Sequence, residues 1–328
     1  MNMEHEVCLI LPYFGRFNTY FNLWLKSCKY NARIDWYIFT DDKSLYPYPE
    51  NVKVKYCSFQ DIQKKAYDLF GYDIQLDKPY DFCKFKVVYH KLFSEVTDKY
   101  EYWGFCDCDL IWGDLYSAIR PALVQRYDKV SWRGHFTLFR NTADINNLYL
   151  SEIPGNTTFK SCIAKQIDEI NLFDECGINR IFDYFGKSIY KKMLFADLKV
   201  KCSHFVCNHF SSSEQYKNEH QIFEWNKGKL YRVYVYNSQI HKEEFIYVHF
   251  LRREMDNLIR EDTDHFLIVP NKFVKYHDLT ASQIIDFSQS RFYWKYYKNR
   301  LKISYLVKAV KRQFTKKKTP DVYPYIIK

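Results

Sequence analysis

Continuous apolar runs that alternate with helical patterns constrain the fold of this chain more than any other feature. The run VCLILPYFG, which ends at Pro12 and Gly15, is typical of a buried parallel strand followed by a loop. This strand–helix alternation predicts an α/β fold with a parallel, doubly wound sheet flanked by helices. Further strands are predicted at IDWYIFTDD, VKVKYCSF and YEYWGF, and helices at residues 19–30, 60–70 and 82–93.

The second half of the chain carries a less regular pattern. At 328 residues with 47% hydrophobic content, the chain can form one large α/β domain or a domain with an appendage. The sequence contains no internal repeat and no low-complexity linker before a basic tail. The pattern predicts one strand at KVSWRGHFTLFR, helices at about residues 158–170 and 176–185, and short strands near HFVCNHF, LYRVYVY and FIYVHFL.

Two features of the composition bear on binding partners. Aromatic residues make up 20% of the chain, and such rings suit sugar faces, nucleotide bases and membrane interfaces as well as an aromatic core. The net charge of +10 lies largely in residues 291–318, which hold 11 Lys or Arg and no Asp or Glu. An anionic partner is therefore expected at this tail, because the rest of the chain is close to neutral.

The N-terminus and the cysteines predict a cytoplasmic protein. The sequence MNMEHEVCLILPYFG carries acidic residues where a signal peptide requires basic ones, and the ten cysteines form no C-x-x-C pair. No run approaches the roughly 20 apolar residues that span a bilayer. Any membrane contact is therefore expected to be peripheral.

Acidic residues follow the predicted strands at one edge of the sheet. Asp41 and Asp42 end the second strand, and Asp107 and Asp109 follow the strand at YEYWGF. In a parallel sheet, ligands bind beyond the carboxyl ends of the strands, where the loop at residues 12–15 also falls. We therefore expect these three loops to converge on one crevice.

Asp107 and Asp109 form a D-x-D pair, which is a candidate metal site. In an extended segment, residues two apart lie on the same face, so both carboxylates can reach one ligand. A hard divalent cation such as Mg²⁺ or Mn²⁺ relieves their repulsion and can neutralise a departing diphosphate. The alternative is a structural pair. A second D-x-D, Asp262 and Asp264, follows no buried strand and is interpreted as a solvated turn.

Six segments within about residues 6–255 stand out, in the order CLILPYFGRFNTYFNLWLKSC, WYIFTDD, WGFCDCDLIWGDL, GHFTLFRN, DECGINRIF and YVHFLRR. Together they resemble a family of bacterial glycosyltransferases of the GT-A type found in capsule and O-antigen polysaccharide loci. The resemblance implies a GT-A-like, Rossmann-type, mostly parallel sheet in a domain at residues 1–289. We expect a nucleotide-sugar half at about residues 1–115, an acceptor half at residues 116–289, and a basic helical tail at residues 290–328.

The resemblance also implies roles for residues near the strand ends. In similar enzymes, the loop after the first strand and the aspartate after the second strand hold the nucleotide. Here these residues are Pro12, Tyr13, Phe14 and Asp41. The two D-x-D aspartates would bind the divalent ion, Mn²⁺ or Mg²⁺, and the donor diphosphate, so Asp107 also belongs to the nucleotide-sugar site.

A histidine near the end of the catalytic domain often completes the metal site in similar enzymes. His249 in YVHFLRR is the candidate, and Arg252 or Arg253 is placed to meet phosphate. The alternative for His249 is a satisfied histidine at a strand end. The segment KPYDFCKFKVVYH departs from relatives that would carry an acidic residue at Lys84. Lys84 and Lys86 either approach the donor phosphates or lie on a solvated helix face.

Transfer with inversion of configuration needs a carboxylate that accepts the proton of the acceptor hydroxyl. Asp174 and Glu175 in FDECGINRIF stand just before a predicted helix and are the candidates. The alternative is that they cap the helix and interact with its dipole. If the enzyme retains configuration, neither residue needs to be a base.

A cluster of cysteines and histidines carries a weaker signal. Cys202, His204, Cys207 and His209 are residue types that bind zinc. Their spacing matches no common zinc finger, and alternate residues of a strand point to opposite faces, so a packed strand is preferred. Cys106 and Cys108, which alternate with the D-x-D aspartates, are expected to face the interior of the sheet.

The leading hypothesis is a metal-dependent hexosyltransferase that uses a nucleotide sugar, with UDP as the expected nucleotide. The acceptor would be a lipid-linked oligosaccharide of surface polysaccharide biosynthesis. One alternative is a phosphohydrolase of the haloacid dehalogenase type, in which a D-x-D aspartate is the nucleophile. Those enzymes usually place this motif after the first strand and follow it with Gly or Thr, whereas LIWGD follows about the fourth strand here.

The basic tail supports the other alternative, a protein without enzymatic activity that binds nucleic acid or membrane. Apolar residues recur in the tail at near-helical spacing among the cations, which predicts a helix that lies on an anionic bilayer surface. We therefore expect a cytoplasmic protein that is peripheral on the inner face of the cytoplasmic membrane and has no nucleic-acid partner. The alternative is a basic helix packed on the catalytic domain. The recurring apolar residues are Phe292, Tyr296, Leu301, Tyr305 and Leu306.

Overall fold

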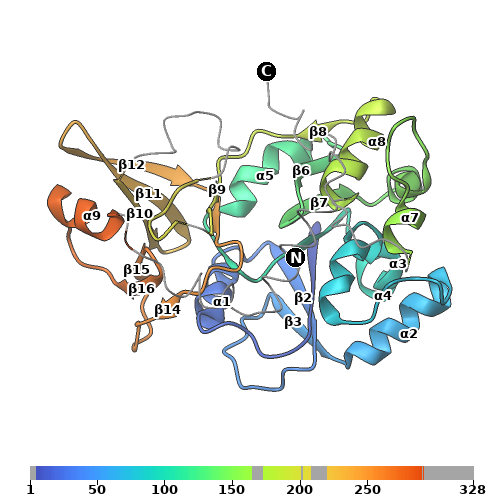
Figure 1. Ribbon diagram of the computed structural model, residues 1–328, viewed down its shortest axis with the longest axis horizontal. Coiled ribbons are helices and arrows are strands. Elements are labelled where there is room, and N and C mark those ends of the chain that lie inside the picture. The colour runs from blue at the N-terminus through green and yellow to red at the C-terminus, as the bar shows by residue number, and fades with distance from the viewer. Residues whose placement is uncertain (1–4, 165–172, 201, 208–219, 290, 292–328) are drawn as a thin grey trace, which may run out of the picture. The chain divides into compact units, whose positions relative to one another are not determined.

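A computed structural model describes residues 5–164, 173–200, 202–207, 220–289 and 291 (Figure 1). The chain divides into two compact units, which are described here separately. The first unit comprises Met1–Cys108 and Leu115–Met193, and the second comprises Asp109–Asp114 and Leu194–Lys328. The boundary between the units therefore falls within the D-x-D pair. The predicted nucleotide-sugar and acceptor halves are functional divisions and stay predictions.

A seven-stranded sheet forms the centre of the first unit, in the order β3-β2-β1-β4-β7-β6-β8. Strands β3, β2, β1 and β4 are parallel, as predicted, whereas β7 is antiparallel to both β4 and β6. The α/β class is confirmed, but the sheet is mixed. The strands are β1 (Val7–Tyr13), β2 (Ile34–Thr40), β3 (Val52–Tyr56), β4 (Tyr102–Cys106), β6 (Lys129–Arg133), β7 (Phe136–Arg140) and β8 (Ile189–Tyr190).

The mixed sheet arises from the segment at residues 129–140. This segment was predicted to be one strand, but it forms β6 and β7 with a tight turn between them. A turn this short can join only antiparallel strands. At Gly134, a side chain would collide with the carboxylates of Asp174 and Glu175.

Short helices cover the sheet of the first unit. The predicted helices near residues 19–30, 60–70 and 176–185 are confirmed, whereas most of residues 82–93 form a 3₁₀ helix. The helix predicted at residues 158–170 is found only as α7, and residues 165–170 lie outside the described residues. The helices are α1 (Phe21–Lys29), α2 (Phe59–Phe70), η1 (Pro79–Val88), α3 (Tyr89–Leu92), α4 (Ser94–Thr97), α5 (Leu115–Val124), α6 (Ala143–Asn147), η2 (Leu148–Leu150), α7 (Phe159–Ile163), η3 (Phe173–Gly177) and α8 (Ile178–Tyr184).

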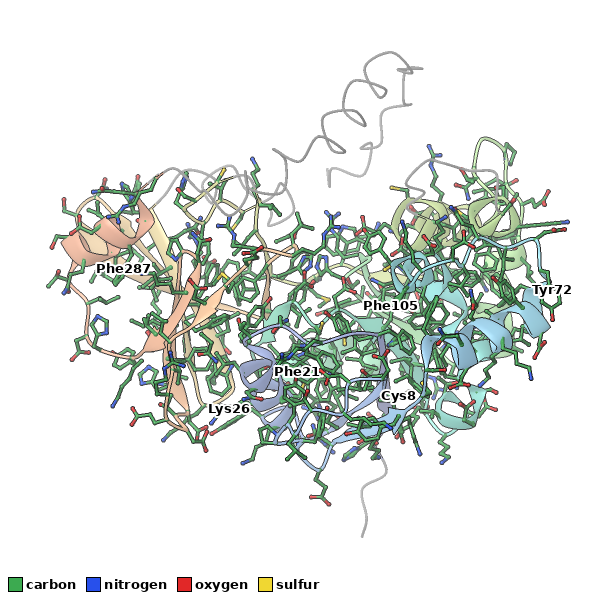
Figure 2. The ribbon with its side chains drawn as sticks, turned by 60° about the horizontal axis from the view of Figure 1, so that its bottom comes forward. Cys8, Phe21, Lys26, Tyr72, Phe105 and Phe287 are labelled. Carbon is green, nitrogen blue, oxygen red and sulfur yellow. The ribbon has the colours of Figure 1, made fainter. Side chains whose placement is uncertain are left out.

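Aromatic side chains fill much of the core between the sheet and these helices. The rings of Phe39 and Phe93 lie 4.1 Å apart, and those of Trp103 and Phe139 lie 4.9 Å apart. Figure 2 shows the dense side chains around the labelled Phe105, which is fully buried. Much of the high aromatic content of the chain therefore serves packing.

The buried amide of Asn51 joins the end of α1 to the start of β2. Its Nδ2 donates to the carbonyl oxygens of Cys28 at 2.9 Å, Asn31 at 3.2 Å and Ile34 at 3.1 Å. No apolar side chain can replace this donor. The amide therefore fixes the connection that leads into β2.

Asn51→Ala is expected to lower the free energy of unfolding by about 2–3 kcal/mol, because the three carbonyl oxygens lose the hydrogen bonds from the Asn51 amide. Denaturant unfolding followed by circular dichroism measures the change. Lys55→Ala, at an exposed position of β3, the strand that follows Asn51, is the control and should stay within about 0.5 kcal/mol of the wild type. Equal stability of the two variants would contradict this role of Asn51.

The second unit contains a six-stranded sheet, β12-β11-β10-β15-β16-β14, and a three-stranded sheet, β5-β13-β9. Helix α9 packs on β10 and β11 (Figure 1), and its buried Ile284 belongs to one hydrophobic cluster with Ile222 and Val233. The elements are β5 (Leu110–Trp112), β9 (Ala196–Asp197), β10 (His220–Asn226), β11 (Lys229–Tyr236), β12 (Gln239–Phe245), β13 (Tyr247–His249), β14 (Asp256–Asn257), β15 (His265–Val269), β16 (Lys272–Lys275) and α9 (Ala281–Ser288).

The strands predicted at LYRVYVY and FIYVHFL are confirmed as β11 and β13. The strand predicted near HFVCNHF is wrong for its described part, where Cys207 makes an isolated bridge with Leu198. Among the described residues, no helix is long and apolar enough to span a membrane. Apart from Arg291, the predicted tail helix at residues 291–318 lies outside the described residues.

Candidate functional site

The loop after β1 and the aspartate after β2 lie together in the first unit. Pro12 and Tyr13 end β1, which is parallel to β2. The backbone N–H of Gly15 donates to Oδ1 of Asp41 at 2.7 Å. Gly15 has φ of 96°, a conformation that favours glycine. Pro12 and Tyr13 were predicted in the loop but belong to β1, and the shorter loop, which begins at Phe14, meets Asp41 through Gly15.

Asp42 anchors the continuation of the same loop. Its carboxylate accepts hydrogen bonds from the N–H of Phe17 at 3.2 Å, the N–H of Ser44 at 3.0 Å and the hydroxyl of Tyr46 at 3.1 Å. Partial burial favours the neutral acid, but these hydrogen bonds lower the pKa of Asp42 to about 2. Asp42 is therefore ionised at neutral pH, and its role is to hold the loop.

Asp107 follows β4 in the first unit and is held by two contacts. Its N–H donates to the carbonyl of His135 at 3.0 Å, and its Oδ1 accepts from Nζ of Lys86 at 2.7 Å. Lys86 also donates to the carbonyl of Gly134 at 2.6 Å. Burial disfavours the ammonium, but the charge of Asp107 dominates the opposing interactions, and the pKa of Lys86 is raised well above its usual value.

The two lysines of this segment have different surroundings. Lys86 is buried, so the alternative of a solvated helix face is wrong for this residue. Lys84 is less buried, and its Nζ donates to Oε1 of Gln75. A role of Lys84 toward donor phosphates stays a prediction.

Asp174 and Glu175 lie in η3, a π-helical turn that leads into α8. Oε1 of Glu175 accepts from the N–H of Gly134 at 2.7 Å, and Oε2 lies 3.7 Å from the Arg133 guanidinium. The N-cap residue of α8 is Gly177, and it has no capping side chain among the described residues. Neither carboxylate therefore caps α8.

Asp109, Asp197 and His249 meet in the second unit. Strand β13 pairs antiparallel with β5 and parallel with β9, which brings His249 opposite Asp197. Nδ1 of His249 lies 2.8 Å from Oδ1 of Asp197, and Nε2 lies 3.3 Å from Oδ1 of Asp109. Although burial favours the neutral ring, the two carboxylates raise the pKa of His249 to about 10.

A turn after β13 fixes the second carboxylate oxygen of Asp109. The N–H of Arg252 donates to Oδ2 of Asp109 at 2.6 Å, and the N–H of Phe250 donates to the Asp109 carbonyl at 2.8 Å. Leu251 and Arg252, with φ of 51° and 60°, have the left-handed conformation that forms this turn. Arg252 therefore contacts Asp109 through its backbone, and contact of its side chain with phosphate stays a prediction.

The residues around His249 fit a divalent cation. A carboxylate that accepts the proton of one ring nitrogen leaves the other nitrogen as a ligand, and Asp197 is placed for this at Nδ1. Nε2 of His249 and Oδ1 of Asp109 then face each other as nitrogen and oxygen donors. The first D-x-D aspartate, Asp107, stands two residues earlier in the chain. This donor set suits Mn²⁺ or Mg²⁺.

Arg253 and the cysteine–histidine cluster serve other purposes. The buried guanidinium of Arg253 donates to the carbonyls of Lys199, Cys202 and Ser203 and to Oδ1 of Asn271. It therefore holds the backbone of this segment. Among the described residues, Cys202, His204 and Cys207 form no group of converging metal ligands, and His209 lies outside the described residues. Cys106 and Cys108 are buried, as expected.

Comparison with known proteins gives a family but no activity. A family model described as "Family of unknown function (DUF6625)" matches residues 9–277. No curated protein matches the chain. The matched range includes the candidate residues of both units.

Proposed function

This chain belongs to DUF6625, a family of unknown function, and we propose that it is a metal-dependent glycosyltransferase of the GT-A type. The single observation that carries the proposal is the arrangement of Asp109, His249 and Asp197. The pairing of β13 with β5 and β9 places His249 beside Asp109, the second D-x-D aspartate, and Asp197 orients the His249 ring. A catalytic metal site needs this kind of fixed ligand orientation.

The donor would be a nucleotide sugar, with UDP as the expected nucleotide. Pro12 and Tyr13 end the first strand and Phe14 follows it, and the hydrogen bond from Gly15 to Asp41 joins the loop after β1 to the end of β2. Ligands of such sheets bind at the carboxyl ends of parallel strands, which supports a nucleotide site here. Asp42 keeps the loop in place through its three hydrogen bonds.

Asp107, Asp109 and His249 would hold the cation in this proposal, and Asp197 would orient His249. A bound Mn²⁺ or Mg²⁺ would supply positive charge that stabilises the departing diphosphate. Lys86 holds the Asp107 carboxylate in one position. The N–H of Arg252 does the same for Asp109. Asp174 and Glu175 are the carboxylates available to accept the proton of the acceptor hydroxyl.

A thermal-shift measurement with UDP and Mn²⁺ tests this function. We expect the two together to raise the melting temperature more than either alone, because a ligand that binds only the folded state stabilises it. AMP with Mn²⁺ is the nucleotide control. No shift with UDP and Mn²⁺, or the same shift with EDTA present, would count against the proposal and would leave the phosphohydrolase alternative open.

The acceptor would be a lipid-linked oligosaccharide, which the chain would meet at an anionic membrane surface. The basic composition of residues 291–318 supports this location on the inner face of the cytoplasmic membrane. Each basic residue near such a surface contributes about 1 kcal/mol. A location at the membrane raises the local concentration of both the enzyme and a lipid-linked acceptor.

We expect the full-length protein to float with liposomes that contain anionic lipid and to be released as salt rises, because the attraction is electrostatic. A chain truncated after Gln289 should stay in the soluble fraction and still bind UDP and Mn²⁺. Liposomes of neutral lipid are the control. Equal flotation of the truncated and full-length proteins would contradict membrane binding through the tail.

A further inference from the structure

We propose that Asp174 is the proton acceptor of the transfer reaction and that Glu175 is a positioning residue that holds the turn between β6 and β7. This assignment rests on the proposed function, because it concerns a transfer in which an acceptor hydroxyl loses its proton. From the sequence alone, Asp174 and Glu175 are both candidates for the base. Their surroundings in the first unit differ.

Glu175 is already bound on both carboxylate oxygens. Oε1 accepts from the N–H of Gly134 at 2.7 Å, and Oε2 lies 3.7 Å from the guanidinium of Arg133, which is buried. A carboxylate held in this way serves as a fixed anion for the turn and not as a base.

Asp174 has a different environment. Among the described residues, its carboxylate makes no hydrogen bond or ion pair with another side chain. It lies against Gly134, where an added Cβ would come within 2.6 Å of its Oδ2. The absence of a side chain at Gly134 therefore leaves room for the Asp174 carboxylate beside the turn.

Burial raises the pKa of Asp174 to about 7, and the charges of Glu175 and Asp107 act in the same direction, whereas Lys86 opposes them. An aspartate with this pKa exchanges its proton near neutral pH, which suits a general base. The charged and titratable groups that interact electrostatically with Asp174 lie on η1, α3, β6, α7 and η3 and at the end of β4. They are Lys86, Tyr89, Lys129, Cys162, Glu175, Cys176 and Asp107.

The turn that Glu175 holds is fixed from a second side by a buried lysine. Nζ of Lys129 donates to the carbonyl of Ser131 at 3.1 Å and to Oδ1 of Asn179 at 2.6 Å. Nδ2 of Asn179 donates to the carbonyl of Trp132 at 3.0 Å. Ser131 has φ of 69°, and the β6–β7 register shifts at this point. The bulge of β6 is therefore tied to α8, which continues from the η3 turn that contains Asp174.

The chemical step balances with Asp174 in this role. The acceptor oxygen forms a bond to the anomeric carbon of the donor, and the bond between that carbon and the diphosphate oxygen breaks with its electron pair on the diphosphate. The proton of the acceptor hydroxyl passes to the Asp174 carboxylate. Ionised Asp174 is the reactive form, so turnover should fall as pH drops through about 7.

Asp174→Asn and Glu175→Gln separate the two roles, with Asp183→Asn, an exposed carboxylate of α8, as the control. We measure UDP released from a panel of UDP-sugars with Mn²⁺ in the presence of a bacterial lipid extract, at pH 5 to 9. Asp174→Asn should lower kcat by roughly 10² or more, leave KM for the donor unchanged, and abolish the fall toward acid pH. In Glu175→Gln, kcat should still fall toward acid pH, and the melting temperature should be lower than that of the wild type.

Melting temperatures give a readout that does not depend on activity. Because the pKa of Asp174 is raised in the folded state, its contribution to stability is present at low pH and is lost as pH rises through about 7. The melting temperature of Asp174→Asn minus that of the wild type should therefore grow between about pH 4 and pH 7. Asp174→Ser, which is smaller, provides a second variant if the amide does not fit beside Gly134.

The outcomes distinguish this assignment from the proposed function. A wild type that releases UDP while Asp174→Asn matches it in kcat and in pH profile would overturn the assignment alone. The same holds if Glu175→Gln is the variant that abolishes the acid limb. A wild type that releases no UDP and binds no UDP with Mn²⁺ would overturn the proposed function, and the assignment with it.

Discussion

Asp109→Asn is expected to lower transfer by roughly 10³ or more, because the cation loses a ligand and the leaving diphosphate loses its counter-charge. Asp109 is fixed on one oxygen by the N–H of Arg252 at 2.6 Å and faces Nε2 of His249 at 3.3 Å. An amide would place either an N–H donor or a weaker oxygen ligand at that position. Asp107→Asn should have an effect of the same order.

Asp197→Asn should weaken metal binding less than Asp109→Asn does. It leaves both D-x-D aspartates in place but removes the carboxylate that orients His249, so the affinity for Mn²⁺ should fall by roughly 10–100-fold. Asp262→Asn, in the second D-x-D of the sequence, changes an exposed residue and is the matched control. Turnover of Asp109→Asn close to that of the wild type, with Asp262→Asn indistinguishable from it, would defeat the metal hypothesis.

Lys86→Met is expected to be the most destabilising substitution near the first unit's carboxylates. It leaves Oδ1 of Asp107 and the carbonyl of Gly134 without the ammonium that binds both. Removing one partner of a buried pair costs about 3–5 kcal/mol. We expect the lower end, roughly 3 kcal/mol, because the Asp107 side chain is 33% exposed and water can reach it.

Transfer should also fall in Lys86→Met, because Asp107 is no longer held in one position. Lys84→Met is the matched control for stability, since it removes a lysine of the same segment that binds Gln75 and not Asp107. Lys86→Arg keeps the charge and should recover part of the stability. Denaturant unfolding and UDP release measure the two effects. Equal stability of Lys86→Met and Lys84→Met would contradict a role of Lys86 as the partner of Asp107.

The parallel strands could be predicted from the sequence because each is a continuous apolar run. Residues of β1 and β2 are buried on both faces, so neither face shows the alternation of a half-exposed strand. The β6–β7 hairpin could not be separated from one long strand, because its turn contains a single glycine between two strand-like segments. The prediction of a parallel sheet therefore failed where this hairpin enters it.

Local sequence signals predict the candidate site where its residues are neighbours in sequence, whereas the 12–15 loop with Asp41 was expected from the strand ends and His249 from the family resemblance. Asp107 and Asp109 stand two residues apart, and Asp174 and Glu175 are adjacent. Lys86 and Asp107 are separated by 21 residues, and Asp197 and His249 by 52, so their pairing depends on how strands and helices pack. Asp197 carries no local signal, since it ends a strand of two residues.

The most direct test of the central claim is the rate of UDP release from UDP-glucose, UDP-galactose, UDP-N-acetylglucosamine and UDP-N-acetylgalactosamine. The wild type is measured with Mn²⁺ and again with EDTA, and Asp109→Asn is measured with Mn²⁺. A metal-dependent glycosyltransferase predicts release from at least one donor that requires Mn²⁺ and is lost in Asp109→Asn. Release that continues unchanged in EDTA, or equal release by Asp109→Asn and the wild type, would contradict it.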